Sequence, residues 1–341
     1  MTREAPPDIR NVAAAAGVSI ATVSRVMSGR GPVSQATRRR VLQAVELLGY
    51  SPSASARSLR TTRTQLIGVL VPDLANAVFV PFLRGVQHEA QQAGYSVLVV
   101  DAQRSKEIEA AAVERLVELR VEALVLAGRA RDPDRLAGLA ARGMVVTTAE
   151  DEAAGSGGLI VELEDVGTAE MCEALAALGH RHLLYATGSQ LPGEAGVWRL
   201  ASLRQHCERR RLQVSRLVVK RSSDSRTAAA LLRAALAPTV GDPPTAVVCA
   251  TLPLAPTLLA GFAAARLRLP IDCSFVTYGD SPWAAAYQPA ISVVALDLYE
   301  AAVELTRRTL AEISGSTSFV ATRPEPARFL DRASVGPARR P

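Results

Sequence analysis

The sequence predicts an α/β protein in which a small three-helix segment precedes a larger region with two doubly wound parallel sheets. Residues 8–50 show the apolar spacing of three short helices. Beyond residue 64, apolar runs of strand length alternate with helical stretches, and the alternation occurs in two successive sets. Such alternation favours parallel sheets that are covered by helices on both faces. A chain of 341 residues is also long enough for two or three hydrophobic cores.

The basic charge of the chain is concentrated at its N-terminal end. Residues 1–64 contain ten arginines and three acidic residues, so this segment carries +7, whereas the whole chain carries +6 and the rest therefore −1. A basic segment on a nearly neutral body is typical of a domain that binds a polyanion. A solvated basic face without a partner is the alternative.

Residues 8–50 divide into three helices that short turns connect. The first begins after Asp8, a favourable N-cap, and ends at Gly17, which adopts a left-handed conformation at little cost. Ser19 caps the second helix only two residues later, so these helices form a tight helix-turn-helix pair. Ser34 caps the third helix, whose expected buried residues are Val41, Leu42, Val45 and Leu48.

The second helix has two faces, because positions four apart lie on the same side of a helix. Val23, Val26 and Met27 face the first helix. The opposite side presents the residues that would enter a DNA major groove, namely Ile20, Ala21, Ser24 and Arg25. This geometry is that of a DNA-binding helix-turn-helix, in which arginine is the commonest reader of guanine.

Four consecutive stretches resemble the head-piece and hinge of the lactose-repressor (LacI/GalR) family of bacterial transcriptional regulators: Val18–Val26, Gly31–Ser34, Leu48–Tyr50 and Ala56–Arg60. One head-piece contacts few bases, so we expect a homodimer that binds a pseudo-palindromic operator, most simply as a repressor. The predicted base contacts are Ile20, Ala21 and Arg25. The predicted phosphate contacts are Ser19, Thr22, Ser24, Ser34, Thr37 and Arg38.

The resemblance also implies a hinge helix over Ala54–Arg60, with Ser53 as its cap. Two such helices, one from each subunit, would enter the minor groove, where Ala56 lies and Leu59 wedges open the central base step. A helix this short does not persist alone, so we expect it to form only when paired on DNA. An ordinary linker is the alternative.

The later pattern resembles the periplasmic-binding-protein-like core of the same family. The expected strands are residues 66–71, 96–100, 123–126, 145–148, 158–161, 183–186, 217–219, 246–249, 274–278 and 319–322. The expected domains are a DNA-binding domain at 1–50, a hinge at 51–64 and an effector-binding and dimerisation core at 65–341. By resemblance, lobe 1 of the core comprises about 65–162 and 295–324, and lobe 2 about 163–291 and 325–341.

Ligands of doubly wound sheets bind beyond the carboxyl ends of the strands, so the two lobes predict a cleft between them. By resemblance, Arg199 is the arginine that grips the ligand. Trp198 and Trp283 lie near strand ends, where an indole could stack on a sugar, although core packing is favoured for both. The predicted effector-binding residues are Asp73, Asn76, Phe79, Thr148, Arg199, Thr251, Gly279 and Trp283.

Three segments depart from the family at the cleft. Thr147–Thr148 stands in place of Asp-Arg, Ala250–Leu252 in place of Ala-Asn-Asp, and Gly279 in place of a ligand-facing aspartate. Hydroxyl groups, or no group at all, thus replace the carboxylates and amides that hold sugar hydroxyls and purine edges. We therefore expect such effectors to bind weakly. Either the effector is less polar than a sugar, or the cleft has lost effector control.

Other classes of function lack support in the sequence. The four histidines and four scattered cysteines show no metal-ligand spacing, and no catalytic set or GxGxxG motif is present, so neither an enzyme nor a cofactor is expected. Pro253 and Pro256 interrupt the uncharged stretch 245–265, which we interpret as strand, loop and helix rather than a membrane span. Without a signal sequence, an exported solute-binding protein is disfavoured and a cytoplasmic, nucleoid-associated regulator is expected.

Overall fold

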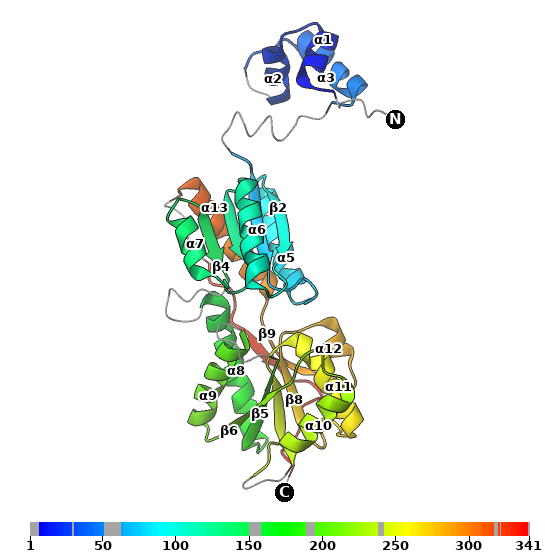
Figure 1. Ribbon diagram of the computed structural model, residues 1–341, viewed down its shortest axis with the longest axis vertical. Coiled ribbons are helices and arrows are strands. Elements are labelled where there is room, and N and C mark those ends of the chain that lie inside the picture. The colour runs from blue at the N-terminus through cyan, green and yellow to red at the C-terminus, as the bar shows by residue number, and fades with distance from the viewer. Residues whose placement is uncertain are drawn as a thin grey trace. The chain divides into compact units, whose positions relative to one another are not determined.

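The computed structural model describes residues 7–28, 31–50, 63–149, 158–188, 195–237, 242–316, 320 and 322–339. The chain divides into two compact units, Met1–Thr64 and Gln65–Pro341 (Figure 1). Each unit has its own hydrophobic clusters.

The small unit has three described helices: α1 (Ile9–Ala16), α2 (Ile20–Ser28) and α3 (Gln35–Leu48). The predicted helix ends are confirmed. Asp8 accepts hydrogen bonds from two backbone amides of α1, Gly17 has a φ of 63°, and Ser34 accepts the backbone N–H of Thr37. The buried core of the unit consists of Val12, Ala13, Ala16, Val23, Val26, Val41 and Ala44.

One buried position of α3 was predicted wrongly. Leu42 is 48% exposed, whereas Ala44 is buried. The inward stripe of α3 follows Val41, Ala44, Val45 and Leu48, the i, i+3, i+4 and i+7 positions of one helix face, and Leu42 lies beside that stripe.

Lobe 1 of the large unit is a parallel sheet with helices on both faces. Its strands, in the spatial order β2-β1-β3-β4, are β1 (Leu66–Val71), β2 (Ser96–Asp101), β3 (Ala123–Leu126) and β4 (Val145–Thr148). Alternation along β1 divides the core, because Ile67, Val69 and Val71 belong to one cluster and Leu70 to the other. The first cluster includes α5 (Phe79–Gln92) and α13 (Leu298–Ser314), and the second α6 (Lys106–Glu118) and α7 (Pro133–Ala140).

Lobe 2 has a six-stranded sheet in the order β10-β9-β8-β7-β5-β6. Its strands are β5 (His182–Thr187), β6 (Gln213–Val218), β7 (Ala246–Cys249), β8 (Ser274–Tyr278), β9 (Ser292–Ala295) and β10 (Arg328–Leu330). All neighbours are parallel except β10, which is antiparallel to β9. The helical elements are α8 (Gly158–Ala177), α9 (Ala195–Arg209), α10 (Ser225–Leu236), η1 (Leu252–Leu254), α11 (Ala255–Ala265) and α12 (Pro282–Ala286).

The predicted α/β architecture is therefore confirmed, with three local corrections. The expected strand at 158–161 is the first turn of α8, in which Ile160 packs into the lobe 1 core. The short strands β9 and β10 were not predicted. Of the expected strand at 319–322, residues 319 and 321 lie outside the described part, and Val320 and Thr322 are not in a strand. Thr322 donates from its backbone and its hydroxyl to the Glu304 carboxylate of α13 instead.

A buried histidine fastens the C-terminal segment to lobe 2. His180 Nδ1 lies 2.7 Å from the Thr245 hydroxyl, and Nε2 lies 3.1 Å from the Gly336 carbonyl oxygen. Ser274 Oγ accepts the Gly336 amide at 3.1 Å, so both chain segments share one polar cluster. Burial lowers the pKa of His180, although the hydrogen bond to Gly336 opposes that shift.

We expect this histidine to make folding pH-sensitive. Because its folded pKa lies below the unfolded value of about 6.5, the unfolded chain binds the proton first, and stability falls as the pH drops below about 6.5. The slope is at most about 1.4 kcal/mol per pH unit for one proton. Urea unfolding at several pH values should give a free energy of unfolding that depends less steeply on pH in His180→Gln than in the wild type, with exposed His88→Gln measured as the matched control. Equal pH dependence in His180→Gln and the wild type would contradict this origin.

Candidate functional site

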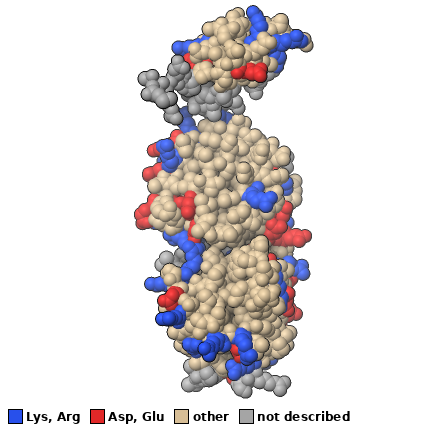
Figure 2. Space-filling model, turned by 90° about the vertical axis from the view of Figure 1, so that its right-hand side faces the viewer, with Lys and Arg blue, Asp and Glu red and all other residues tan. Residues whose placement is uncertain are grey.

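The outer face of α2 is the candidate nucleic-acid interface. Val23 and Val26 are buried, while Ile20, Ala21 and Arg25 are exposed on the other side of the helix. Ile20 is 47% exposed, so a branched apolar side chain faces solvent. On the face in Figure 2 most of the charged side chains of the small unit are basic, in keeping with its local charge.

The hydroxyls expected to hold phosphates also build the helix N-termini. Ser19 Oγ accepts the Thr22 amide at 3.2 Å and lies 2.9 Å from the Thr22 hydroxyl. Ser34 and Thr37 repeat this arrangement at the start of α3. Two helix N-termini of the small unit thus carry exposed hydroxyl groups, and a helix N-terminus favours phosphate. The predicted hinge contacts Ser53, Ala56 and Leu59 lie outside the described residues.

A large cavity of about 1170 Å³ lies between the two lobes of the core unit. Its walls include the segments that follow β1, β2 and β3 of lobe 1 and β7, β8 and β9 of lobe 2, so it occupies the carboxyl edges of both sheets. Five of the predicted effector-binding residues line it: Asn76, Phe79, Arg199, Thr251 and Gly279.

Three predicted effector-binding residues are placed differently. Asp73 is 8% exposed, and its carboxylate binds Arg221 of lobe 2 at 2.8 Å. Thr148 ends β4 and is not a lining residue. Trp283 starts α12 and packs against the apolar core between the lobe 2 sheet and α11, away from the cleft, as the core-packing alternative predicted. These three residues lie at or after strand ends in the sequence, but their side chains do not line the cavity.

Asp73 therefore links the lobes instead of lining the cavity. Arg104 of lobe 1 adds a second contact to the same carboxylate at 3.6 Å. Burial would raise the pKa of Asp73, but the hydrogen bond and charge of Arg221, with smaller contributions from Ala75 N–H and Arg104, hold it below the usual value. A second contact between the lobes is Arg129, whose guanidinium carbon lies 5.9 Å from the centre of the Trp198 ring.

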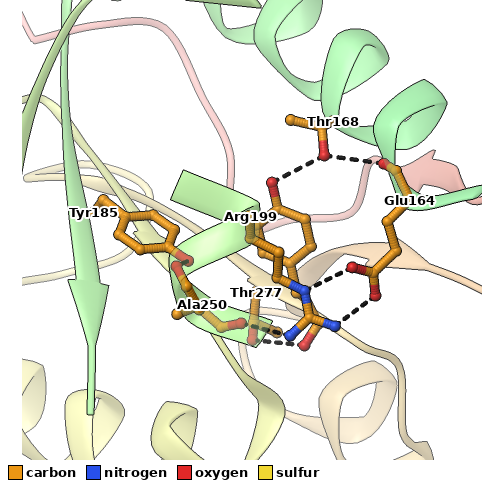
Figure 3. A network of polar contacts seen from close by, with 8 residues as sticks. Glu164, Thr168, Tyr185, Arg199, Ala250 and Thr277 are labelled. Atoms are coloured by element: carbon orange, nitrogen blue, oxygen red, sulfur yellow. Dashed lines mark hydrogen bonds and ion pairs between the residues drawn. The ribbon is translucent and has the colours of Figure 1, made fainter. Parts of the chain in front are cut away.

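The guanidinium of Arg199 is held by other groups of this chain (Figure 3). Its Nε and Nη2 donate to the two oxygens of the Glu164 carboxylate at 2.7 and 2.5 Å. Nη1 donates to the Ala250 carbonyl oxygen at 2.9 Å, and the guanidinium carbon lies 5.0 Å from the centre of the Tyr278 ring. The side chains of Arg199 and Glu164 are only 15% and 9% exposed.

The polar groups beneath this pair are buried and hydrogen-bonded. Thr168 follows Glu164 by one turn of α8, and its hydroxyl bonds the Glu164 carbonyl oxygen and the Tyr278 hydroxyl, each at 2.9 Å. Tyr185 donates to the Gly196 carbonyl oxygen at 2.6 Å. Burial raises the pKa of both tyrosines, so both phenols are neutral donors at neutral pH. The base of the cavity is a preformed polar network.

Glu164 was not predicted as a site residue. Residues 158–161 were expected to form a strand, so the single helix α8 that places Glu164 one turn before Thr168 was not recognised. Basic residues of the lobe 1 wall were also missed. Three lie in loops without a local pattern, and the fourth is the first residue of α6: Arg104, Arg129, Arg131 and Lys106.

The four cysteines are buried and reduced. Burial raises the pKa of Cys249 and Cys273 to about 12, so neither thiol is a thiolate at neutral pH. Cys172 and Cys207 lie closer than their sequence separation suggested, with 3.8 Å between their sulfur atoms across α8 and α9. Within the described ranges, no group of three or more His, Cys, Asp or Glu side chains is placed to hold a metal ion.

Comparison with known proteins agrees with both units. Residues 8–53 match the model for bacterial regulatory proteins of the lacI family, and residues 172–335 match that for a periplasmic binding protein-like domain. The chain superimposes on the Lac repressor dimer bound to operator and the anti-inducer ONPF with a TM-score of 0.83 and 26% identity, covering 97% of this chain and 100% of that one. The chain belongs to the LacI family.

The chain is also similar in sequence to known members of the LacI family. Catabolite control protein A of Streptococcus mutans is 27% identical over 86% of this chain and 87% of its own. The regulator GalS of Salmonella typhimurium is 43% identical, but over only 36% of each chain. These relatives are transcriptional regulators, and this LacI-family chain is a DNA-binding transcriptional regulator. In the part of the chain that the structure describes, no helix is both long and apolar enough to cross a membrane.

Proposed function

We propose that this regulator represses transcription as a homodimer bound to a pseudo-palindromic operator. The exposed face of α2 supports the proposal, since Ile20, Ala21 and Arg25 protrude while Val23 and Val26 fix the helix from within. One α2 helix spans too few base pairs for specific binding, and a two-fold axis doubles the contacts. With one arginine per helix for bidentate pairing, apolar contacts and DNA deformability supply much of the specificity.

The individual contacts belong to the same proposal. Bases are contacted by Ile20, Ala21 and Arg25, and phosphates by Ser19, Thr22, Ser24, Ser34, Thr37 and Arg38. Residues 1–50 form the DNA-binding domain, 51–64 the hinge, and 65–341 the effector-binding and dimerisation core. The regulator acts in the cytoplasm on chromosomal DNA and catalyses no reaction.

Selection of bound sequences from random duplexes with the purified full chain tests this proposal. The expected result is an enriched palindrome with a central CG step, bound with a steep dependence on salt because several phosphates are neutralised. No enrichment would contradict operator binding by the unliganded protein and would make a ligand in the cleft a requirement for it.

For the cleft, we propose an effector less polar than a sugar. The groups expected to hold sugar hydroxyls are replaced by Thr251, Gly279 and Thr148, and the last of these does not line the cavity. Apolar side chains line much of the remaining wall: Val78, Phe79, Ile160, Leu252, Leu296 and Leu298. Such walls suit a largely apolar ligand. Binding of the effector would change the free energy of operator binding by about 1–3 kcal/mol, the usual range for linked sites.

The competing function is regulation without an effector. The direct contacts between the lobes favour it, because the Asp73–Arg221 pair joins the lobes through side chains of the protein itself. Thermal unfolding in the presence of metabolite pools separates the two functions. Stabilisation by an apolar fraction would support an effector, and no stabilisation by any pool would favour the effector-independent regulator.

A further inference from the structure

The strongest unexplained feature of the cleft is that Arg199, the arginine expected to grip a ligand, is already bound by another side chain of this protein. In a cavity that recognises a ligand, an arginine offers a planar set of N–H donors to the ligand's acceptors. Here both donors that form a bidentate pair, Nε and Nη2, point at the carboxylate of Glu164. The carboxylate therefore occupies the position that a ligand carboxylate or a pair of ligand hydroxyls would take.

We propose that Glu164 is an internal ligand of the cleft, which occupies Arg199 and excludes ligands that depend on this arginine. The proposal deepens the proposed function, on which it rests, by naming the excluded class: small carboxylates and polyhydroxylated sugars. Glu164 is thus the residue that determines this specificity.

The surroundings of the pair fix it in place. The Ala250 carbonyl holds Nη1, the Tyr278 ring lies beneath the guanidinium, and Thr168 fastens Tyr278 to the same turn of α8 that carries Glu164. Rotating Glu164 away would leave a mostly buried guanidinium without its carboxylate, and arginine does not lose its proton. A ligand must compensate for that loss before it gains any affinity.

Glu164 and a free ligand also pay different entropic costs for binding Arg199. Glu164 is tethered to α8 and meets Arg199 intramolecularly, whereas a free ligand loses translational and rotational freedom on binding. A weak carboxylate or a sugar that makes the same two hydrogen bonds therefore cannot displace it at ordinary concentrations. A ligand of the native cleft must take its affinity from the other walls.

Chemical rescue tests the proposal. Glu164→Ala removes the Glu164 side-chain atoms beyond Cβ, which correspond in size to acetate, and leaves the Arg199 donors exposed to the resulting space. Sodium acetate should raise the melting temperature of the full-length Glu164→Ala protein by about 2–4 °C, relative to sodium chloride at equal ionic strength, and in a saturable manner. The wild type should show no shift with acetate or with D-ribose.

The matched control is Glu89→Ala, which removes a carboxylate from Arg307 at 2.8 Å outside the cleft. Because Arg307 is 49% exposed and already hydrated, this variant should show no saturable response to acetate. If Glu164→Ala is insoluble in chloride buffer, recovery of folded protein in acetate gives the same support, and failure of acetate to recover it counts against the proposal.

Two results would overturn the proposal. A wild-type protein stabilised by acetate or D-ribose would mean that Glu164 yields to ligands, and a folded Glu164→Ala protein indifferent to acetate would mean that Arg199 offers no ligand site. Selection of an operator is carried out separately on the wild type. Failure of the wild type to enrich any operator sequence would count against the proposed function while leaving the acetate result intact.

Discussion

Replacing Gly85 with alanine is expected to destabilise the core unit by about 3 kcal/mol or more, at the upper end of the range for overpacked sites. A Cβ atom at Gly85 would lie 2.5 Å from the backbone oxygen of Tyr299 and 3.0 Å from the Ala302 side chain. These atoms belong to α13, which crosses α5 on one face of the lobe 1 sheet (Figure 1). Because backbone lies on both sides of the contact, the helices must separate, which opens a gap in the core.

Urea unfolding of the full chain, followed by circular dichroism, measures this loss. Gly138→Ala is the matched control, since Gly138 is also inside a helix but nothing lies within 4 Å of a Cβ built there. Alanine has the higher helix propensity, so this control should be as stable as the wild type or up to about 1 kcal/mol more stable. Equal stability of Gly85→Ala and Gly138→Ala would show that α5 and α13 do not pack this closely.

Local chemistry made the head-piece predictable from sequence. Asp8, Gly17 and Ser34 set helix ends through contacts with residues at most four positions away, and these ends are confirmed. Strands such as β1 and β7 are continuous apolar runs buried on both faces, so they too could be recognised without tertiary information. The predicted burial of Leu42 was wrong because the apolar residues of α3 allow more than one buried face. Packing against α1 and α2 determines which face is buried.

The elements that were missed depend on distant partners. β10 is three residues long and is a strand only because it pairs with β9, more than thirty residues earlier in the chain. The apolar run at 158–161 is too short to distinguish strand from helix, and it became the start of α8. The second error lies where the chain passes between the lobes, since Ile160 packs in lobe 1 while later residues of α8 pack in lobe 2.

The cleft was predictable in position but not in chemistry. The end of the first strand indicated Asn76 and Phe79 as lining residues, and the resemblance to the family indicated Arg199. The partner of Arg199 could not be inferred, because Glu164 precedes it by thirty-five positions and shares no local pattern with it. Trp283 followed a strand end as well, yet its indole packs on the lobe 2 core.

Replacing Arg25 with alanine should lower the affinity for the selected operator while leaving binding to random duplex nearly unchanged. Arg25 belongs to the last turn of α2 and is exposed on the same side as Ile20 and Ala21, so its guanidinium is placed to reach a base edge. A bidentate arginine–guanine pair contributes about 1–3 kcal/mol of discrimination, which corresponds to a loss of about 5–150-fold per half-site. Neither neighbouring side chain can replace it, because isoleucine and alanine have no side-chain donor.

Fluorescence anisotropy on the operator and on a random duplex, at several salt concentrations, measures both affinities. Arg38→Ala provides the comparison, because it removes the same charge from an exposed position at the start of α3, where a phosphate contact is proposed. It should weaken binding to both duplexes equally and reduce the salt slope by about one phosphate contact. If Arg25→Ala instead behaves like Arg38→Ala, Arg25 binds phosphate, and sequence is recognised through Ile20, Ala21 and the deformability of the central step.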